Sequence, residues 1–169
     1  MIVLDSAVVM KWYKHGERHE AEALDLRQRI ERREVEAAVS ELVPLEVVRG
    51  LKVAQRRDPS LGLTDAAIES AFANLLTMSQ SGVLSHFPVT LASAKAKDII
   101  LALGLFMADA VQLATAVVLG AQYFATENHH FTAPFVCNGA AAMGVSVVDV
   151  PQMIAILNAS GGGPVTTGS

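Results

Sequence analysis

The sequence predicts an α/β fold in which helices cover both faces of a mainly parallel sheet of four to five strands. The main observation is that short apolar segments alternate along the chain with segments of helical periodicity, an order that is typical of parallel sheets. The composition agrees, because 51% of the 169 residues are hydrophobic and 18% are charged, which suffices for the core of one domain. We expect this domain to span residues 1–150, followed by an extension over 151–169 that is disordered from about residue 160, where Gly, Ser and Thr dominate.

The predicted strands are short and apolar. The first, at residues 2–4, is the run Ile-Val-Leu, whose mostly β-branched side chains indicate a buried strand. Further strands are expected at residues 35–39, 83–89, 122–125 and 145–148. Because helical segments separate them, these strands are expected to run parallel.

The segments between the strands have helical patterns and N-terminal caps. Residues 17–33 carry one apolar stripe, at Ala23, Leu26 and Ile30, as expected for a helix that packs on a sheet. The remaining helices are expected at 6–12, at 41–55 with Ser40 as N-cap, from Thr64 to about 79, from Thr90 to about 103, and from Asp109 to 120.

Composition and charge exclude several classes of function. The single cysteine, Cys137, can form neither an internal disulfide nor a thiolate metal site. The net charge of −4 excludes nucleic-acid binding by bulk positive charge. Asp5 and Lys11 interrupt the apolar N-terminus, unlike an export signal, and Asp109 lies near the middle of the apolar stretch 99–126, where a bilayer would penalise it. We therefore expect a cytoplasmic protein that does not enter a membrane.

Polar side chains follow the predicted strands at their carboxyl ends. Asp5 comes directly after the first strand, and Thr-Glu-Asn at 126–128 comes directly after the fourth. Glu46 lies in the helix after the second strand, and Asp109 opens its own helix. Ligands of parallel sheets bind at this edge, where several carboxylates would repel one another unless a hard cation such as Mg²⁺ joined them. An acidic pocket with such an ion is suited to attack on a phosphodiester.

Each of these residues also has a purely structural interpretation. Asp5 and Asp109 are both placed to cap helices, Glu46 is placed to pair with a nearby arginine, and 126–128 is suited to an ordinary turn. Asp109 most needs a partner or an ion, because an unpaired buried carboxylate costs several kcal/mol. We interpret the histidines at 129 and 130 as exposed loop residues rather than ligands.

Four segments together resemble the successive motifs of the PIN-domain family. They are V-L-D-S-A-V-V-M-K-W-Y at 3–13, S-E-L-V-P-L-E-V-V-R-G-L at 40–51, A-D-A-V-Q-L-A-T-A at 108–116 and A-T-E-N-H-H-F at 125–131. Order, spacing and size agree from residue 2 to about 150, and within the family the chain is most similar to VapC-type toxins of bacterial toxin–antitoxin pairs. The resemblance implies a three-layer α/β/α fold, Mg²⁺- or Mn²⁺-dependent cleavage of RNA, a homodimer and a cognate antitoxin protein.

The resemblance also implies roles for single residues. The acidic metal-binding positions of the family fall on Asp5, Glu46 and Asp109. Asn128 stands where the family usually has a fourth acid, and this departure favours one bound ion over two. Ser6 and Thr126 match hydroxyl positions that support the ligands. The resulting hypothesis is that Asp5 and Asp109 ligate the ion, Glu46 ligates it or acts as base, and Asn128 positions water.

Residues that hold the substrate are expected in the N-terminal third of the chain. Eleven of the 13 Lys and Arg residues lie between Lys11 and Arg57, and Lys11 and Lys14 directly follow the first motif. An alternative function, motivated by Asn128, is a non-catalytic PIN-like module that binds RNA or protein. A phospho-receiver domain is disfavoured, because it needs a lysine after a late strand and none follows Lys97.

Overall fold

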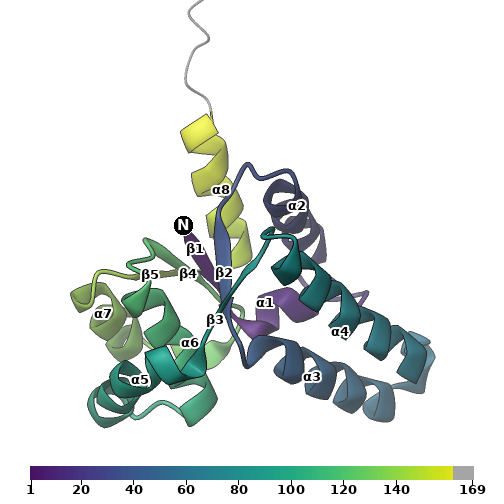
Figure 1. Ribbon diagram of the computed structural model, residues 1–169, viewed down its shortest axis with the longest axis horizontal. Coiled ribbons are helices and arrows are strands. Elements are labelled where there is room, and N and C mark those ends of the chain that lie inside the picture. The colour runs from purple at the N-terminus through teal and green to yellow at the C-terminus, as the bar shows by residue number, and fades with distance from the viewer. Residues whose placement is uncertain (162–169) are drawn as a thin grey trace, which may run out of the picture.

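Five short parallel strands form the centre of the computed structural model, which describes residues 1–161 (Figure 1). They are β1 (Ile2–Leu4), β2 (Ala37–Ser40), β3 (Ser85–Phe87), β4 (Tyr123–Ala125) and β5 (Ser146–Val148). Their order in the sheet is β3-β2-β1-β4-β5, and all four pairings are parallel. Ile2 of the central strand β1 lies between Ala37 and Tyr123. The predicted parallel sheet is thus confirmed.

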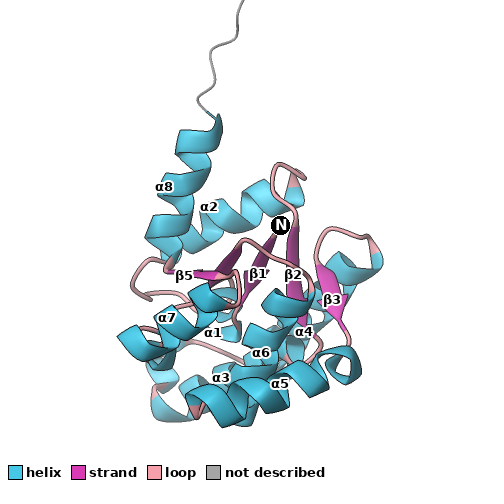
Figure 2. Cartoon of the chain, turned by 90° about the vertical axis from the view of Figure 1, so that its left-hand side faces the viewer, coloured by secondary structure: helices cyan, strands magenta, loops and turns pink. Residues whose placement is uncertain are grey.

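Helices cover both faces of this sheet, which confirms the predicted α/β class (Figures 1 and 2). They are α1 (Ser6–Met10), α2 (Glu20–Glu31), α3 (Val43–Arg57), α4 (Asp65–Gln80), α5 (Val89–Leu103), α6 (Met107–Val118), α7 (Pro134–Ala142) and α8 (Val150–Gly161). Two short 3₁₀ helices, η1 (Pro59–Leu61) and η2 (His129–Phe131), complete the described elements.

Two hydrophobic cores lie on the two faces, and alternation along β1 explains how one strand serves both. Ile2 and Leu4 belong to the core on the side of α1–α4 and α8, whereas Val3 belongs to the core under α5–α7. Successive side chains of a strand point to opposite faces. A three-residue run without a polar residue is therefore what a strand covered on both faces requires.

Several predicted boundaries were wrong by a few residues. Ser40 is not the N-cap of α3 but the last residue of β2, and the helix begins at Val43 with Leu42 as N-cap. The reason is Pro44, which is favoured in the first turn and so places the helix start later. Likewise Thr90 lies inside α5, which starts directly after Pro88. Thr64 does cap α4, accepting a hydrogen bond from the Ala67 N–H.

The C-terminal part of the described chain contains two helices that the sequence analysis did not predict, α7 and α8. Helix α8 packs against α2, and its residues Val150 and Met153 are buried in the core on that face. Ser160 and Gly161 are the last residues of α8. The rest of the segment expected to be disordered, 162–169, lies outside the described residues.

No single helix within residues 1–161 has the length and apolarity needed to cross a membrane. Helices α5 and α6 reach that composition only as a pair, and their axes are bent by 117°.

The topology creates a site at the carboxyl edge of β1 and β4. From β1 the chain continues through helices to β2 and β3 on one side of the sheet, and later returns to β4 and β5 on the other. Strand order therefore reverses between β1 and β4, and in open parallel sheets ligands bind outside the carboxyl ends at such a reversal. The residues that follow these two strands are Asp5 and the segment 126–128.

Candidate active site

Four different elements bring the predicted acidic residues to this edge. Asp5 is the N-cap of α1, directly after β1, and it is 1% exposed. Glu46 lies in the first turn of α3, and Asp109 is the third residue of α6. Asn128 follows β4 and is the N-cap of η2. The crossover helix α6 contacts β1, β2 and β4, so its first turn reaches the edge where the strands end.

Asp5 is held by hydroxyl groups and by its own helix. The hydroxyl of Thr126 donates to Asp5 Oδ2 at 2.5 Å, and the hydroxyl of Ser6 donates to Oδ1 at 3.2 Å. The N–H of Ala7 donates to Oδ1 at 3.4 Å. The N-capping role considered for Asp5 is therefore present, but a single cap does not require burial between two hydroxyls. Ser6 and Thr126, the hydroxyl residues expected to support the site, both contact this carboxylate.

Glu46 is positioned by a residue that the sequence analysis did not assign to the site. The side-chain amide of Gln112, which is 1% exposed in α6, donates to Glu46 Oε2 at 2.7 Å. The carbonyl oxygen of the same amide accepts the N–H of Ser6 at 3.0 Å. Gln112 therefore links α3 and α6 to the start of α1.

Asp109 is held by the segment that follows β4. The amide of Asn128 donates from Nδ2 to Asp109 Oδ1 at 3.1 Å, and its Oδ1 accepts the His130 N–H at 3.1 Å. Nδ1 of His130 lies 3.0 Å from Asp109 Oδ2. The orientation of the Asn128 amide is fixed by these two partners, since its oxygen must accept and its nitrogen must donate. An aspartate at 128 would lack the donor that binds Asp109.

These contacts form one continuous chain of hydrogen bonds around a cleft. The chain runs through Glu46, Gln112, Ser6, Asp5, Thr126, Asn128 and Asp109. The cleft has a volume of about 510 Å³ and is lined by residues that include Asp5, Glu46, Arg49, Ala108 and Asn128. Side chains that are far apart in the sequence thus share one concave site.

The electrostatics of the cleft are those of crowded, poorly solvated acids. Burial raises the pKa of Asp5, and its hydrogen bond from Thr126 opposes this only in part. Burial, with the charges of Asp5 and Asp109, raises the pKa of Glu46 to about 7. In the described part of the chain neither Asp5 nor Glu46 forms an ion pair. Of the three predicted acids, Asp109 alone contacts a histidine there, His130. Arg49 lines the cleft and its charge opposes the rise in the pKa of Glu46, but it forms no ion pair with either acid.

This donor set fits a hard divalent cation in its chemistry. Carboxylate oxygens are the ligands that Mg²⁺ and Mn²⁺ prefer, and a bound cation would oppose both the burial and the mutual repulsion that raise the pKa values of Asp5 and Glu46. Among residues 1–161, however, no three His, Cys, Asp or Glu side chains are already grouped closely enough to hold a metal. Instead each acid is bound by its own neutral donor, namely Gln112, Thr126 or Asn128.

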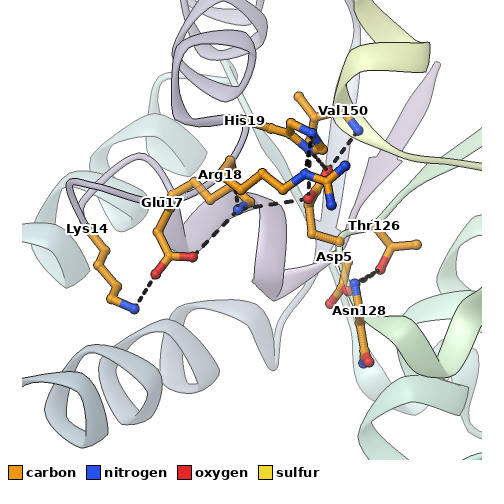
Figure 3. A network of polar contacts seen from close by, with 10 residues as sticks. Asp5, Lys14, Glu17, Arg18, His19, Thr126, Asn128 and Val150 are labelled. Atoms are coloured by element: carbon orange, nitrogen blue, oxygen red, sulfur yellow. Dashed lines mark hydrogen bonds and ion pairs between the residues drawn. The ribbon is translucent and has the colours of Figure 1, made fainter. Parts of the chain in front are cut away.

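A second network lies next to this site and contains Lys11 and Lys14, the two lysines expected to contact RNA, both paired with Glu17. Figure 3 shows this network with Lys14 labelled. Lys11 is 5% exposed, and its Nζ donates to the Arg18 carbonyl oxygen at 2.6 Å and lies 3.8 Å from Glu127 Oε2. Glu127 also contacts His19 Nδ1 at 3.1 Å and accepts the N–H of Val150 at 3.1 Å. Lys11 therefore faces away from the cleft.

Lys14 lies at the other end of that network. It pairs with Glu17 and lines a cavity next to the acidic cleft. Figure 3 shows Lys14 and Glu17 on one side of the network and Asp5, Thr126 and Asn128 on the other. A role of Lys14 in RNA binding stays a prediction.

Two residues of the site were not identified from the sequence. Gln112 lies three residues after Asp109 on the same helix, and a lone amide in an apolar run requires buried partners. That spacing is a signal that could have found it. His130, interpreted as an exposed loop residue, is half-buried and contacts Asp109 because η2 turns its ring back toward α6. No sequence pattern indicates that turn.

Comparison with known proteins agrees with this geometry. The PIN domain family model matches residues 2–134, a range that contains all four residues predicted to form the site. The curated proteins include no sequence that matches the chain. The family match covers well over half of the chain and spans the sheet from β1 to β4. The chain therefore belongs to the PIN domain family, most of whose members are metal-dependent ribonucleases.

Proposed function

We propose that this protein is a metal-dependent endoribonuclease that hydrolyses phosphodiester bonds of RNA. The observation that carries the proposal is the hydrogen-bond chain that joins Asp5, Glu46 and Asp109 beside one cleft, where neither Asp5 nor Glu46 forms an ion pair in the described chain. Keeping several acids together in a poorly solvated site is unfavourable unless they serve an ion or a proton transfer.

Asp5 and Asp109 would hold one Mg²⁺ or Mn²⁺ ion, and Glu46 would either ligate the same ion or act as the base. When bound, such an ion polarises the phosphoryl group and activates water. The neutral partners set the orientation of these ligands: Thr126 and Ser6 hold Asp5, Gln112 holds Glu46 and Asn128 holds Asp109. Groups of this kind usually change metal affinity or activity by about 10–100-fold when removed.

Glu46 is suited to take the proton of the attacking water. It is half-buried at the edge of the cleft, and its pKa of about 7 lies close to neutral pH. A general base works best when its pKa is near the working pH. Asn128, whose amide is engaged with Asp109 and His130, adds no charge and supports a single ion.

The finer role that we propose is that of a VapC-type toxin. The four motifs resemble that group, and such a role implies a homodimer and a cognate antitoxin. Exposed apolar side chains on and beside α5 and α6 offer surface for such partners, among them Leu91, Leu101, Phe106 and Met107. Expression of the chain should stop bacterial growth, Asp5→Asn should abolish the arrest, and light scattering should give a dimer mass. Unimpaired growth of cells producing folded wild-type protein would contradict the toxin role.

A second candidate function is a non-catalytic module that binds RNA or protein. Asn128 favours it, because the fourth acid of the family is absent and its replacement is bound to Asp109.

Titration of Mn²⁺ against cleavage of a labelled RNA separates the two functions. We expect cleavage that depends on the metal and is abolished in Asp5→Asn. Failure of the wild-type protein to cut any RNA while it binds Mn²⁺ would favour the module.

A further inference from the structure

A second cavity continues from the acidic cleft along α3. It has a volume of about 660 Å³ and shares Met10, Arg49 and Gly50 with the cleft. From there it extends along the same helix past Val53 to Arg57. The two cavities therefore form one groove, which we call the α3 groove, with the acids at one end.

The bottom of the groove is a close contact between α1 and α3. A Cβ atom on Gly50 would lie 2.5 Å from Met10 Sδ, so a larger residue there would require the Met10 side chain to shift. A glycine inside a helix costs about 1 kcal/mol relative to alanine, and here it lets the two helices approach where the two cavities meet. The groove is thus part of the packed fold.

The cationic side chains of the α3 groove differ from most others in this protein. Arg27, Arg29 and Lys52 pair with acidic residues, and so does Lys14 within the groove. Arg49 and Arg57 are exposed, and neither forms an ion pair or a hydrogen bond with any residue from 1 to 161. These two arginines are therefore free to bind an external anion.

Their spacing matches the backbone of one nucleic-acid strand. Arg49 and Arg57 both line the groove and are eight residues apart on α3, a distance of about 12 Å along a helix. This is about three nucleotides of a stacked strand, at about 3.4 Å each. Glu46 lies one turn before Arg49 on the same helix, so a strand held by both arginines would enter the cleft at its acidic end.

We propose that Arg49 and Arg57 bind two phosphates of a single-stranded RNA and guide that strand into the acidic cleft; this rests on the proposed function. The guanidinium group matches phosphate oxygens in a two-pronged geometry. Phosphate contacts of this kind set position and not sequence. A single strand is required because Asp5 is recessed, and an extended backbone reaches a recessed site that the body of a duplex does not.

The test measures RNA binding without cleavage, in protein carrying Asp5→Asn. The probe is a fluorescein-labelled 12-nucleotide oligouridylate in Mg²⁺ buffer, followed by anisotropy between 50 and 200 mM NaCl. Adding Arg49→Ala and Arg57→Ala should weaken binding about tenfold. It should also reduce the slope of log K against log[salt] by about 1.4, or about 0.7 for each lost contact. Arg49→Lys with Arg57→Lys should keep most of the slope, because both charges remain.

The matched control removes two cations outside the α3 groove, Arg56 and Lys95, which likewise form no ion pair in the described structure. Arg56→Ala with Lys95→Ala should leave affinity and slope nearly unchanged. An equal loss of RNA affinity in the groove variant and in the control variant would overturn the proposal, because binding would then depend on total charge alone. Efficient displacement of the RNA by polyglutamate would also overturn it, since the groove would then be suited to an acidic polypeptide.

A cleavage assay separates this proposal from the proposed function. If wild-type protein does not cut RNA with Mn²⁺ but the Asp5→Asn protein binds RNA through Arg49 and Arg57, the nuclease proposal is wrong and the proposed RNA binding in the α3 groove is supported. If wild-type protein cuts RNA and Arg49→Ala with Arg57→Ala leaves KM unchanged, the groove proposal fails and the nuclease stands. We expect KM to rise about tenfold with little change in kcat.

Discussion

Two polar clusters, one around Glu127 and one around Asp5, lie side by side at the end of β4, and their acids are stabilised in opposite ways. Glu127 is surrounded by cationic or donor groups, with Lys11, His19 and the Val150 N–H all within reach. Asp5, on the other side of Thr126, has only neutral donors around it. In the first cluster the negative charge of Glu127 is balanced by its partners, which connect α1 to α8. The second lacks a positive charge, which is the property expected of a site that receives one from outside.

The largest effect is expected from breaking the cluster around Glu127. Lys11→Met should lower the free energy of unfolding by about 3 kcal/mol, because it leaves Glu127 buried beside His19 without its main cation. Urea denaturation measures this. The double variant Lys11→Met with Glu127→Gln should regain part of the loss, since glutamine still accepts the Val150 N–H. A loss below about 1 kcal/mol, typical of a surface pair, would mean that Lys11 is not a structural residue.

The same kind of change in the cluster around Asp5 should act on catalysis and not on folding. Asp5→Asn should reduce RNA cleavage by about 100-fold or more, since it removes a ligand and not merely a residue that supports one. Stability of the metal-free protein should stay equal or rise, because burial already disfavours the charged form of Asp5. Cleavage kinetics test the predicted loss of activity, and urea denaturation tests the predicted stability. Strong destabilisation would show that Asp5 serves mainly as a helix cap.

A smaller effect is expected from giving the cleft the acid that it lacks. Asn128→Asp should remove the donor to Asp109 and add a like charge, lowering metal-free stability by about 1 kcal/mol. It should tighten Mn²⁺ binding about tenfold, because affinity rises with the number of charged ligands. Calorimetric titration measures the affinity. Weaker binding in the variant would indicate that the amide of Asn128 is needed to orient Asp109.

The last prediction concerns pH. The raised pKa of Glu46, about 7 against an ordinary 4.5, means that the folded protein binds more protons than the unfolded chain between these values. Stability of the metal-free protein should therefore fall as the pH rises from 4.5 to 7. Glu46→Gln should flatten this decline. Denaturation of both proteins at several pH values, in chelator, provides the difference. Parallel curves would contradict the raised pKa.

Much of the fold could be predicted from local sequence. Strand positions, the parallel arrangement and the cap at Thr64 follow from apolar runs and residue preferences that act over a few residues. Helices α7 and α8 were not predicted, because α7 has no strong apolar stripe and α8 depends on packing against α2. The N-cap predicted at Ser40 was wrong because Ser40 and Pro44 both indicate a helix start, and α3 begins at Val43, where Pro44 falls in its first turn.

For the site, spacing and strand order predicted which acids lie at this edge of the sheet, and not what surrounds them. Asp5, Glu46 and Asp109 could be predicted because the ends of parallel strands converge. Gln112 carried a signal, as a lone amide three residues after Asp109, but its partner Glu46 and the position of His130 depend on the angle at which α6 and η2 approach the sheet. The burial of Lys11 likewise follows from the loop at 13–19, where His19 adopts a positive φ of 61°. The position of Lys11 directly after the first motif therefore indicated that it lies near the cleft, but not that its side chain points away from it.

The most direct test of the central claim is a calorimetric titration of Mn²⁺ into the metal-free protein and two variants. We predict one ion per chain in the wild type, its loss in Asp5→Asn, and unchanged binding in Glu127→Gln, where the altered acid already has cationic partners. Equal binding in all three proteins, or loss of binding in Glu127→Gln alone, would contradict the assignment of the metal to Asp5, Glu46 and Asp109 at the acidic cleft.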